Sequence, residues 1–300
     1  MDSKTKEHQQ PDHGNHGSLQ VIDDPILIRE DWPVLGQGAG GTTRKVEWKS
    51  REMTVAVKAY VGELTSDGSP QDERTISVAA SLAVMASEAK KKDVSESTTP
   101  SSQKIPNPSS CIIKLLGETK STGSLIMEYL DGFEALAGPP SMESCSRDVY
   151  SKRHFLSWEN IWYIVTGLLQ VLRILHQNGI CHGDFYGHNI LISSTKNGEF
   201  HVKLSDFGAA FFYDRSSTAN DGQGIERTEL RAFGILIEEL RDQVWKKEKN
   251  SLDDSVAALD SPPTTDTKKK VEVLTDLIAS CRVPTTTFDE LWKKIQQIAV

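Results

Sequence analysis

An acid and an amide lie five residues apart in the stretch HGDFYGHNIL (182–191). They are Asp184 and Asn189, and the stretch runs into an apolar segment that ends at Ile192. One chemistry needs both side chains: an aspartate accepts a proton from an attacking hydroxyl, while an asparagine holds a metal ion beside it. Turns rich in Gly, Asp and Asn are also common as purely structural features, so this stretch alone leaves both interpretations open.

A glycine cluster, GQGAGG (36–41), stands between two strand-like segments. Gly36, Gly38 and Gly41 fit the spacing G-x-G-x-x-G, which taken alone is equally typical of a hairpin. A dinucleotide-binding turn leads from a strand into a helix, so a place between two strands favours a flap over nucleotide phosphates instead. Backbone N–H groups can approach phosphate oxygens closely only where side chains are missing.

Lys58 ends the run VAVK and follows the glycine cluster by one strand and one turn. A lone lysine in a strand is usually exposed, but an ammonium group at this place could reach the α- and β-phosphates of a nucleotide. Kept inside, it needs a carboxylate partner. Glu73, early in the next predicted helix, is the first candidate, and Glu88 is a poorer one.

A second acid, Asp206, ends a predicted strand within SDFGAA (205–210). A strand-end Asp-x-Gly is a common turn, so the motif alone is weak. Asp206 lies one hairpin beyond Asn189, and the two could therefore bind one Mg²⁺ ion. Oxygen ligands and few protein contacts suit this ion, because phosphate oxygens and water complete its octahedron.

The order of elements predicts an α+β fold with two lobes. Residues 21–130 read as a five-stranded antiparallel sheet with one main helix, which Ser69 and Pro70 begin. Residues 131–300 read as mainly helical, and the longest apolar helix, 159–179, is capped by Ser157 and Gly179. The sequence further predicts a disordered tail (1–20), an insert (87–110) that combines a frayed helix end with a loop, and a charged linker (246–270).

Composition narrows the class of protein. The 300 residues carry a net charge of −8, which argues against nucleic acid or an anionic membrane as the main partner. The four cysteines lie far apart with no C-x-x-C pair, so we interpret them as reduced thiols rather than disulfides or a zinc site. No apolar run is long enough to span a bilayer. We therefore expect a cytoplasmic monomer that binds neither nucleic acid nor membrane.

The glycine flap, the strand lysine, H-x-D-x-x-x-x-N and D-F-G follow one another in this order. In this combination residues 30–300 resemble a protein kinase domain, with HGDFYGHNIL as its catalytic loop. The resemblance implies a two-lobed fold and transfer of the γ-phosphoryl group of ATP, with Mg²⁺, to a hydroxyl. It implies these roles: Asp184 as proton acceptor, Asn189 and Asp206 as metal ligands, Lys58 as the phosphate lysine, and Glu73 as its ion-pair partner.

The resemblance also implies an adenine site. Met127 would be the gatekeeper, the Glu128 carbonyl and the Leu130 amide would bond adenine, and Ala56 and Leu191 would sandwich the purine. More narrowly, HGDFYGHNIL and the segments 133–150 and 227–240 resemble the divergent leucine-rich-repeat-associated kinases of bacteria, plants and algae, although the sequence contains no such repeats.

Several positions depart from the family pattern. Gly183 stands where regulated kinases have an arginine that clamps a phosphate on the activation segment. Tyr186 replaces a lysine that touches the γ-phosphate in serine/threonine kinases, and His188 is a partial substitute for it. No A-P-E motif follows D-F-G, and Glu229 takes the place of the aspartate that anchors the catalytic loop to the next helix.

Three functions stay open on these residues. The favoured one is an enzyme, a serine/threonine-type protein kinase whose partners are ATP and a protein substrate. The H-G-D triplet and the short activation segment also resemble aminoglycoside and choline kinase-like enzymes, which phosphorylate small molecules. Tyr186 and the shortened segment favour a nucleotide-binding pseudokinase scaffold, whereas the intact Lys58, Asp184, Asn189 and Asp206 favour catalysis.

Overall fold

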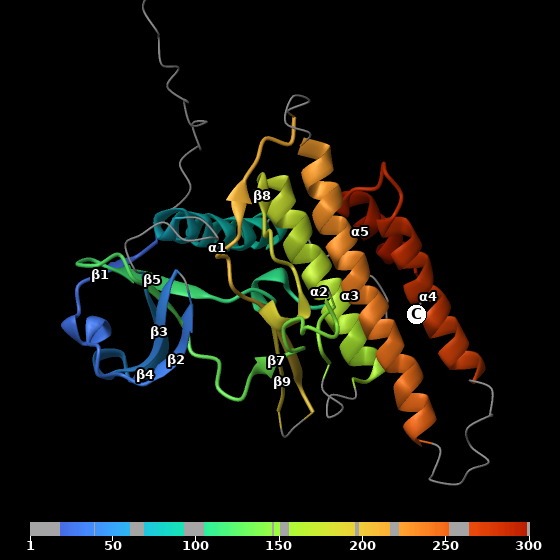
Figure 1. The fold of residues 1–300 in the computed structure, drawn as a ribbon. Coiled ribbons are helices and arrows are strands. Elements are labelled where there is room, and N and C mark those ends of the chain that lie inside the picture. Colours follow the sequence, from blue (N-terminus) through green and yellow to red (C-terminus); the bar gives the residue numbers. More distant parts are fainter. Residues whose placement is uncertain are drawn as a thin grey trace, which may run out of the picture.

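The fold has two lobes, as the computed structural model shows for residues 19–38, 40–60, 69–92, 105–145, 147–150, 156–195, 198–216, 222–251 and 264–298. A sheet with helix α1 (Pro70–Lys92) lies at one side of the molecule and the helices of the second lobe at the other (Figure 1). This arrangement confirms the predicted α+β class. The predicted disordered tail lies outside the described residues except for Leu19 and Gln20.

The first lobe is built on a six-stranded sheet in the order β1-β5-β6-β4-β3-β2. Its strands are β1 (Val21–Ile22), β2 (Val34–Gly38), β3 (Gly41–Trp48), β4 (Met53–Tyr60), β5 (Leu115–Thr119) and β6 (Leu125–Glu128). The five predicted antiparallel strands are present, and β1 is a correction to their number, because it adds a sixth strand parallel to β5. Two residues are too few to produce an alternating pattern. Ile22 instead packs on Gly117, where an added Cβ would lie 2.6 Å from its Cδ1.

Alternation along β4 sorts its side chains between the two faces of the sheet. Val55 and Val57 pack in an apolar cluster with Val46, while Ala56 packs in a separate one with Met127. Because strand side chains point alternately to opposite faces, Lys58 shares the face of Ala56. The sequence therefore turns the lysine toward the same side as helix α1.

Helix α1 begins where the sequence predicts. The Ser69 hydroxyl accepts a hydrogen bond of 3.1 Å from the Asp72 amide, which satisfies one of the amides that a helix start leaves unpaired. The helix end predicted within the insert runs to Lys92, where α1 stops, and Glu88 accepts a bond of 2.9 Å from the Ser109 amide. Residues 93–104, the middle of that insert, lie outside the described residues.

The second lobe contains the helices α2 (Trp158–Gln177), α3 (Gly222–Ser251), α4 (Thr265–Cys281) and α5 (Phe288–Gln297). Helix α2 is buried around most of its circumference and forms the centre of the main core. Ser157 caps its start by accepting a bond from the Asn160 amide, and Gly179 follows its end at a φ of +66°, which an L-residue rarely adopts. Both predicted caps are therefore present.

The predicted linker 246–270 is too long at both ends. Helix α3 continues to Ser251, since the Lys- and Glu-rich sequence there favours helix. Helix α4 already begins at Thr265, where Thr264 caps it, and Asp266 pairs with Lys270 one turn later at 2.6 Å. Residues 252–263 lie outside the described residues.

The remaining strands are short, and they flank the loops in which the predicted site residues lie. The strands β7 (Glu134–Ala135), β9 (Ile190–Ser194) and β10 (Phe200–Leu204) form one sheet, and β8 (Ile180–Cys181) pairs with β11 (Phe211–Phe212). The predicted catalytic loop connects β8 to β9, and Asp206 follows β10. In the part of the chain that the structure describes, no helix combines the length and the apolar character needed to cross a membrane.

Candidate active site

Lys58 and Glu73 form an ion pair between the sheet and helix α1. The side chain of Glu73 is 6% exposed and that of Lys58 is 20% exposed, so the pair is largely withdrawn from water. Asp206 approaches from the other lobe, with its Oδ1 3.9 Å from Lys58 Nζ. The structure thus joins the lysine to the first of its two candidate carboxylates, while Glu88 bonds elsewhere.

A cavity of about 490 Å³ opens between the lobes beside this pair. It is lined by side chains from both lobes, apolar where the purine is expected and charged at the Lys58 end. The predicted residues in its lining are Ala56, Lys58, Glu73, Met127, Glu128, Leu130, Leu191 and Asp206. Leu35 and Thr43, from the hairpin that carries the glycines, also line it. Sequence reasoning missed Tyr60, which lies two residues beyond Lys58 on the same face of β4 and lines the cavity too.

The three motif glycines serve different purposes. At Gly41 an added Cβ would lie 2.2 Å from the Ala59 carbonyl oxygen, so this glycine is required by the pairing of β3 with β4. At Gly36 and Gly38 an added Cβ would meet no atom of the described chain within 4 Å. Internal packing therefore gives no reason for glycine at those two positions, and open backbone of this kind can receive a phosphate.

Asp184 and Asn189 are hydrogen-bonded to each other across the loop. The Asn189 Nδ2 group donates to the Asp184 carbonyl at 2.9 Å and to its carboxylate Oδ2 at 2.8 Å. The Ser205 amide and hydroxyl donate to the Asn189 carbonyl, at 3.0 and 2.9 Å, and so tie the loop to the end of β10. With its nitrogen directed at Asp184, Asn189 keeps its amide oxygen as the atom that can coordinate a metal.

The donor chemistry fits a Mg²⁺ ion. Asp206 is 57% exposed at the cavity and adopts a φ of +59°, and its Oδ1 accepts a bond of 3.2 Å from the Gly208 amide. A carboxylate and an amide oxygen are hard donors of the kind that Mg²⁺ prefers. Within the described ranges no group of three or more His, Cys, Asp or Glu residues could hold a metal. Water and substrate oxygens would therefore have to complete the coordination.

Glu229 holds the predicted catalytic loop on helix α3, as the sequence indicates for this position. Its carboxylate accepts hydrogen bonds from the amides of Gly183 at 2.9 Å and His182 at 3.1 Å, and from His176 Nε2 at 2.6 Å. Burial opposes ionisation of this group, but the bonds from His176 and from the Gly183 amide hold the pKa of Glu229 below its ordinary value. The loop is thus bound to an ionised, buried carboxylate.

The backbone conformation at position 183 explains why the arginine of regulated kinases is absent there. Gly183 has a φ of +78°, and an added Cβ would lie 2.2 Å from the Ala209 carbonyl oxygen. Any side chain here would need the chain to move, since L-residues rarely adopt this conformation. The loop geometry itself therefore excludes an arginine.

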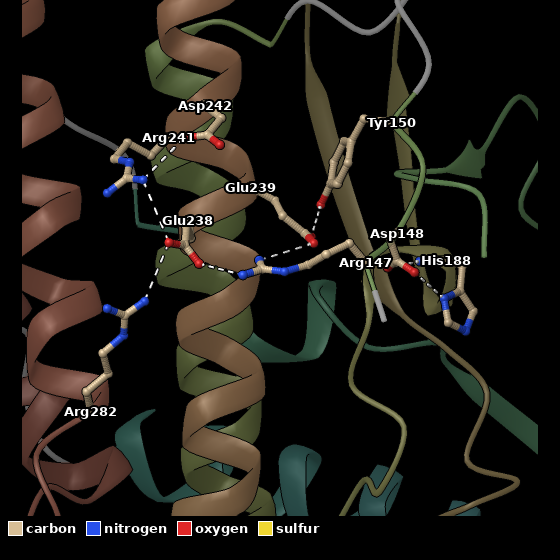
Figure 2. A network of polar contacts seen from close by, with 9 residues as sticks. All are labelled: Arg147, Asp148, Tyr150, His188, Glu238, Glu239, Arg241, Asp242 and Arg282. Carbon is tan, nitrogen blue, oxygen red and sulfur yellow. Dashed lines mark hydrogen bonds and ion pairs between the residues drawn. The ribbon is translucent and has the colours of Figure 1, made fainter. Parts of the chain in front are cut away.

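Sequence reasoning also missed Asp148, which contacts the predicted catalytic loop. Its carboxylate accepts a bond of 2.9 Å from His188 Nδ1 (Figure 2). On the other side of the ring, His188 Nε2 lies 3.6 Å from Asp184 Oδ2. The Tyr186 ring stacks on the His188 ring at 5.7 Å between centroids. Asp148 stands alone in a polar segment forty residues upstream of His188, so no spacing rule could have found it.

A second missed contact fixes the segment between the lobes. Glu128, expected to present its carbonyl to adenine, uses its side chain to bind Lys203 Nζ at 2.5 Å and the Lys114 amide at 2.8 Å. Lys203 is buried and also donates to the Ile112 carbonyl. This pair ties the end of β6, where Glu128 lines the cavity, to strand β10.

Comparison with known proteins places the chain in a family. Residues 30–227 match the family model described as protein kinase domain, which is more than half of the chain. The chain therefore belongs to the protein kinase domain family. The match begins just before the glycine hairpin and ends within the first turns of α3, so it contains both walls of the cavity and the catalytic loop.

Curated relatives are kinases of yeast and plants. The chain is 28% identical over 236 residues to the probable L-type lectin-domain containing receptor kinase S.5 of Arabidopsis thaliana, an alignment that covers 69% of this chain and 29% of that protein. It is 29% identical over 120 residues to SNF1-activating kinase 1 of Saccharomyces cerevisiae, covering 40% of this chain and 10% of that protein. The chain thus spans less than a third of the length of these relatives.

Proposed function

We propose that this chain binds ATP with Mg²⁺ and transfers the γ-phosphoryl group to a serine or threonine hydroxyl of a protein. The observation that carries this proposal is the Lys58–Glu73 ion pair at the charged end of the cavity, with Asp206 3.9 Å from the lysine. A fixed ammonium group beside a metal-binding acid suits a polyphosphate, and phosphoryl transfer depends mainly on positioning and charge neutralisation.

Each predicted site residue has a separate role in this reaction. Lys58, held by Glu73, neutralises the α- and β-phosphates, and the backbone at Gly36, Gly38 and Gly41 covers the phosphates. Asn189 and Asp206 would hold Mg²⁺, which when bound supplies charge neutralisation at the phosphate oxygens. Asp184 accepts the proton of the attacking hydroxyl.

The apolar end of the cavity is assigned to adenine. Ala56 and Leu191 lie in its lining and would enclose the purine from above and below. Met127 lines it as the gatekeeper, and the Glu128 carbonyl and Leu130 amide would bond the ring edge. The Glu128–Lys203 pair supports this part of the proposal, because it fixes the backbone that would bond adenine.

A small-molecule acceptor is the second candidate. The connection from β11, which ends at Phe212, to α3, which begins at Gly222, is short. A long activation segment provides the ledge for a peptide in many protein kinases, and a short one favours a smaller acceptor. A pseudokinase scaffold would bind nucleotide without turnover.

Two measurements on the wild-type chain test the proposal. ATP with Mg²⁺ should raise the melting temperature, since a ligand at a hundred times its dissociation constant adds about 2.7 kcal/mol to the free energy of unfolding. Radiolabelled ATP should then be offered with generic protein substrates and with a metabolite panel. A melt that millimolar Mg-ATP leaves unmoved contradicts any ATP-binding function, and labelled metabolites alone would select the second candidate.

The finer resemblance to leucine-rich-repeat-associated kinases, a cytoplasmic location and a monomeric state also belong to this proposal. Cys111, Cys181 and Cys281 are buried free thiols, and Cys145 is an exposed free thiol. Free thiols support a reducing compartment. Sedimentation of the purified chain would test the monomeric state.

A further inference from the structure

A buried acid from outside the catalytic loop contacts the loop directly. The Asp148 side chain is 0% exposed, and it accepts hydrogen bonds from the His188 ring Nδ1 at 2.9 Å and from the His188 backbone amide at 3.3 Å. At Gly187 an added Cβ would lie 3.1 Å from both Asp148 Oδ2 and the Tyr150 hydroxyl. The loop can approach Asp148 this closely because residue 187 has no side chain.

The segment that carries Asp148 is anchored on both sides of it. Arg147 donates to Glu238 at 2.8 Å and the Tyr150 hydroxyl donates to Glu239 at 3.1 Å, both on helix α3 (Figure 2). Arg282 from the end of α4 also contacts Glu238, at 3.5 Å. Backbone bonds of 2.9 Å between Gly138 and Val149 close the segment into a loop. Asp148 is therefore held at a fixed distance from α3.

The other nitrogen of the His188 ring faces the predicted proton acceptor. His188 Nε2 lies 3.6 Å from Asp184 Oδ2, the same oxygen that accepts the bond from Asn189 Nδ2 at 2.8 Å. Asp184 Oδ1 makes no hydrogen bond or ion pair with the residues that the structure describes. Asn189 and His188 thus both lie beside Oδ2, and Oδ1 remains open to an acceptor hydroxyl.

We propose that Asp148 and His188 are positioning residues for Asp184. Asp148 fixes the orientation of the His188 ring, and the ring, with Nε2 3.6 Å from Asp184 Oδ2, limits the positions open to the Asp184 carboxylate so that Oδ1 is presented to the hydroxyl. A base contributes its full effect only when it lies within hydrogen-bond reach of the proton that it accepts. This inference rests on the proposed phosphoryl transfer and deepens it at the same site.

Two substitutions of His188 separate its two contacts. In His188→Asn the amide nitrogen can replace Nδ1 and keep the bond to Asp148, but nothing replaces Nε2 beside Asp184. In His188→Gln the longer amide can reach toward Asp184, but the bond to Asp148 is lost. If the positioning of Asp184 needs both contacts, kcat falls about tenfold or more in each variant. A tenfold fall corresponds to about 1.4 kcal/mol of barrier. The dissociation constant for Mg-ATP should stay within about twofold, because the effect is on the transferring step.

Substitutions of Asp148 give an independent measurement. Asp148→Ala should lower kcat by a similar factor, and Asp148→Asn, which keeps an acceptor oxygen for the His188 amide, should recover part of the loss. Asp266→Asn, an exposed acid in the first turn of α4, is the matched control and should leave kcat unchanged. If Asp148→Ala fails to fold, the two His188 variants still decide the question.

The outcomes separate this inference from the proposed function. Wild-type turnover with a kcat of His188→Asn within about twofold of wild type overturns the positioning role alone, because a loop that needs only the Asp148 bond keeps it in that variant. A second outcome also overturns the positioning role. If the KM for ATP rises in every variant by the same factor as kcat falls, the pair acts in nucleotide binding. Wild-type protein that transfers no phosphoryl group to any acceptor overturns the proposed function and this inference with it.

Discussion

The proposed nucleotide side and the proposed acceptor side of the cleft are built by different means. On the nucleotide side, Lys58 and Ala56 come from one strand and Glu73 comes from the helix that follows, so regular elements place each side chain. On the acceptor side, Asp184 lies in the loop between β8 and β9, outside the one-turn 3-10 helix that the loop contains (Gly187–Asn189). Its surroundings are fixed by Glu229 on α3 and by Asp148, which is distant in the sequence.

This difference shows how strongly the fold restricts the choice of residue on each side. Strand alternation and one ion pair are enough to place the phosphate lysine, and they leave little choice of residue. A loop can be supported by any group that reaches it with the right hydrogen bonds. The proposed acceptor side has Gly183 and Tyr186 in place of the family residues, and contacts from elsewhere in the second lobe hold it.

The largest expected effect separates binding from turnover. Asp184→Asn should lower kcat by about 10²–10⁴-fold, the usual range for a general base, and leave Mg-ATP binding nearly intact. Asp206→Asn should weaken Mg-dependent nucleotide binding, because Asp206 would contact the metal before any chemistry occurs. Titration calorimetry with Mg-ATP and single-turnover kinetics measure the two quantities. Equal loss of binding in both variants would contradict the assigned roles.

The anchor of the catalytic loop should carry the next largest effect. Glu229→Ala leaves the amides of His182 and Gly183 and the His176 ring without their buried acceptor. Removal of one partner from a buried charged hydrogen-bond network costs about 3 kcal/mol of the free energy of unfolding. Urea unfolding measures this loss. Glu272→Ala, on the exposed face of α4, is the matched control and should change stability by less than about 0.5 kcal/mol.

A smaller effect concerns the charged network behind Asp148. Burial raises the pKa of Glu239 to about 7; nearby Asp148 adds to the rise, and Tyr150 and Arg147 oppose it. Between the unfolded pKa of about 4.3 and the folded value, the folded chain binds a proton that the unfolded chain has lost. The contribution of Glu239 to stability is therefore complete below about pH 4 and is lost as the pH rises through 7.

Glu239→Gln tests this pH dependence. The free energy of unfolding of the wild type should fall relative to that of the variant by about 1–2 kcal/mol between pH 5 and pH 8, after allowance for solvent screening. Urea unfolding at several pH values gives both curves. Parallel curves for the two proteins would show that Glu239 is ionised throughout, and the acceptor-side support would then not depend on its protonation.

The smallest expected effect concerns phosphorylation of the activation segment. Gly183 offers no guanidinium group, and Arg215 is already paired with Glu226 at 3.2 Å. Replacement of Ser216, Ser217 and Thr218 by alanine should therefore change turnover by less than about twofold, as should phosphatase treatment. A tenfold loss from either would show that the segment is a phosphoswitch and that the acceptor side is regulated as in kinases with an arginine at position 183.

Local sequence signals predicted most of the fold and the contact between Lys58 and Glu73. The strands beside the cavity, the caps of α1 and α2, and the facing of Lys58 toward Glu73 all follow from periodicity and capping chemistry, which act between near neighbours. Element ends were less predictable. The charged end of α3 lacks an apolar face that would show where the helix stops, so the predicted linker begins too early.

Only the tertiary structure decided what surrounds the catalytic loop. Asp148 becomes part of the site because Arg147 and Tyr150 bind helix α3 on either side of it, and those partners lie about ninety residues further along the chain. The strand β1 and the Glu128–Lys203 pair are also contacts between distant segments. A side chain that acts through a long-range hydrogen bond leaves no periodic trace in the sequence, because its partner is selected by the packing of whole elements and not by its neighbours.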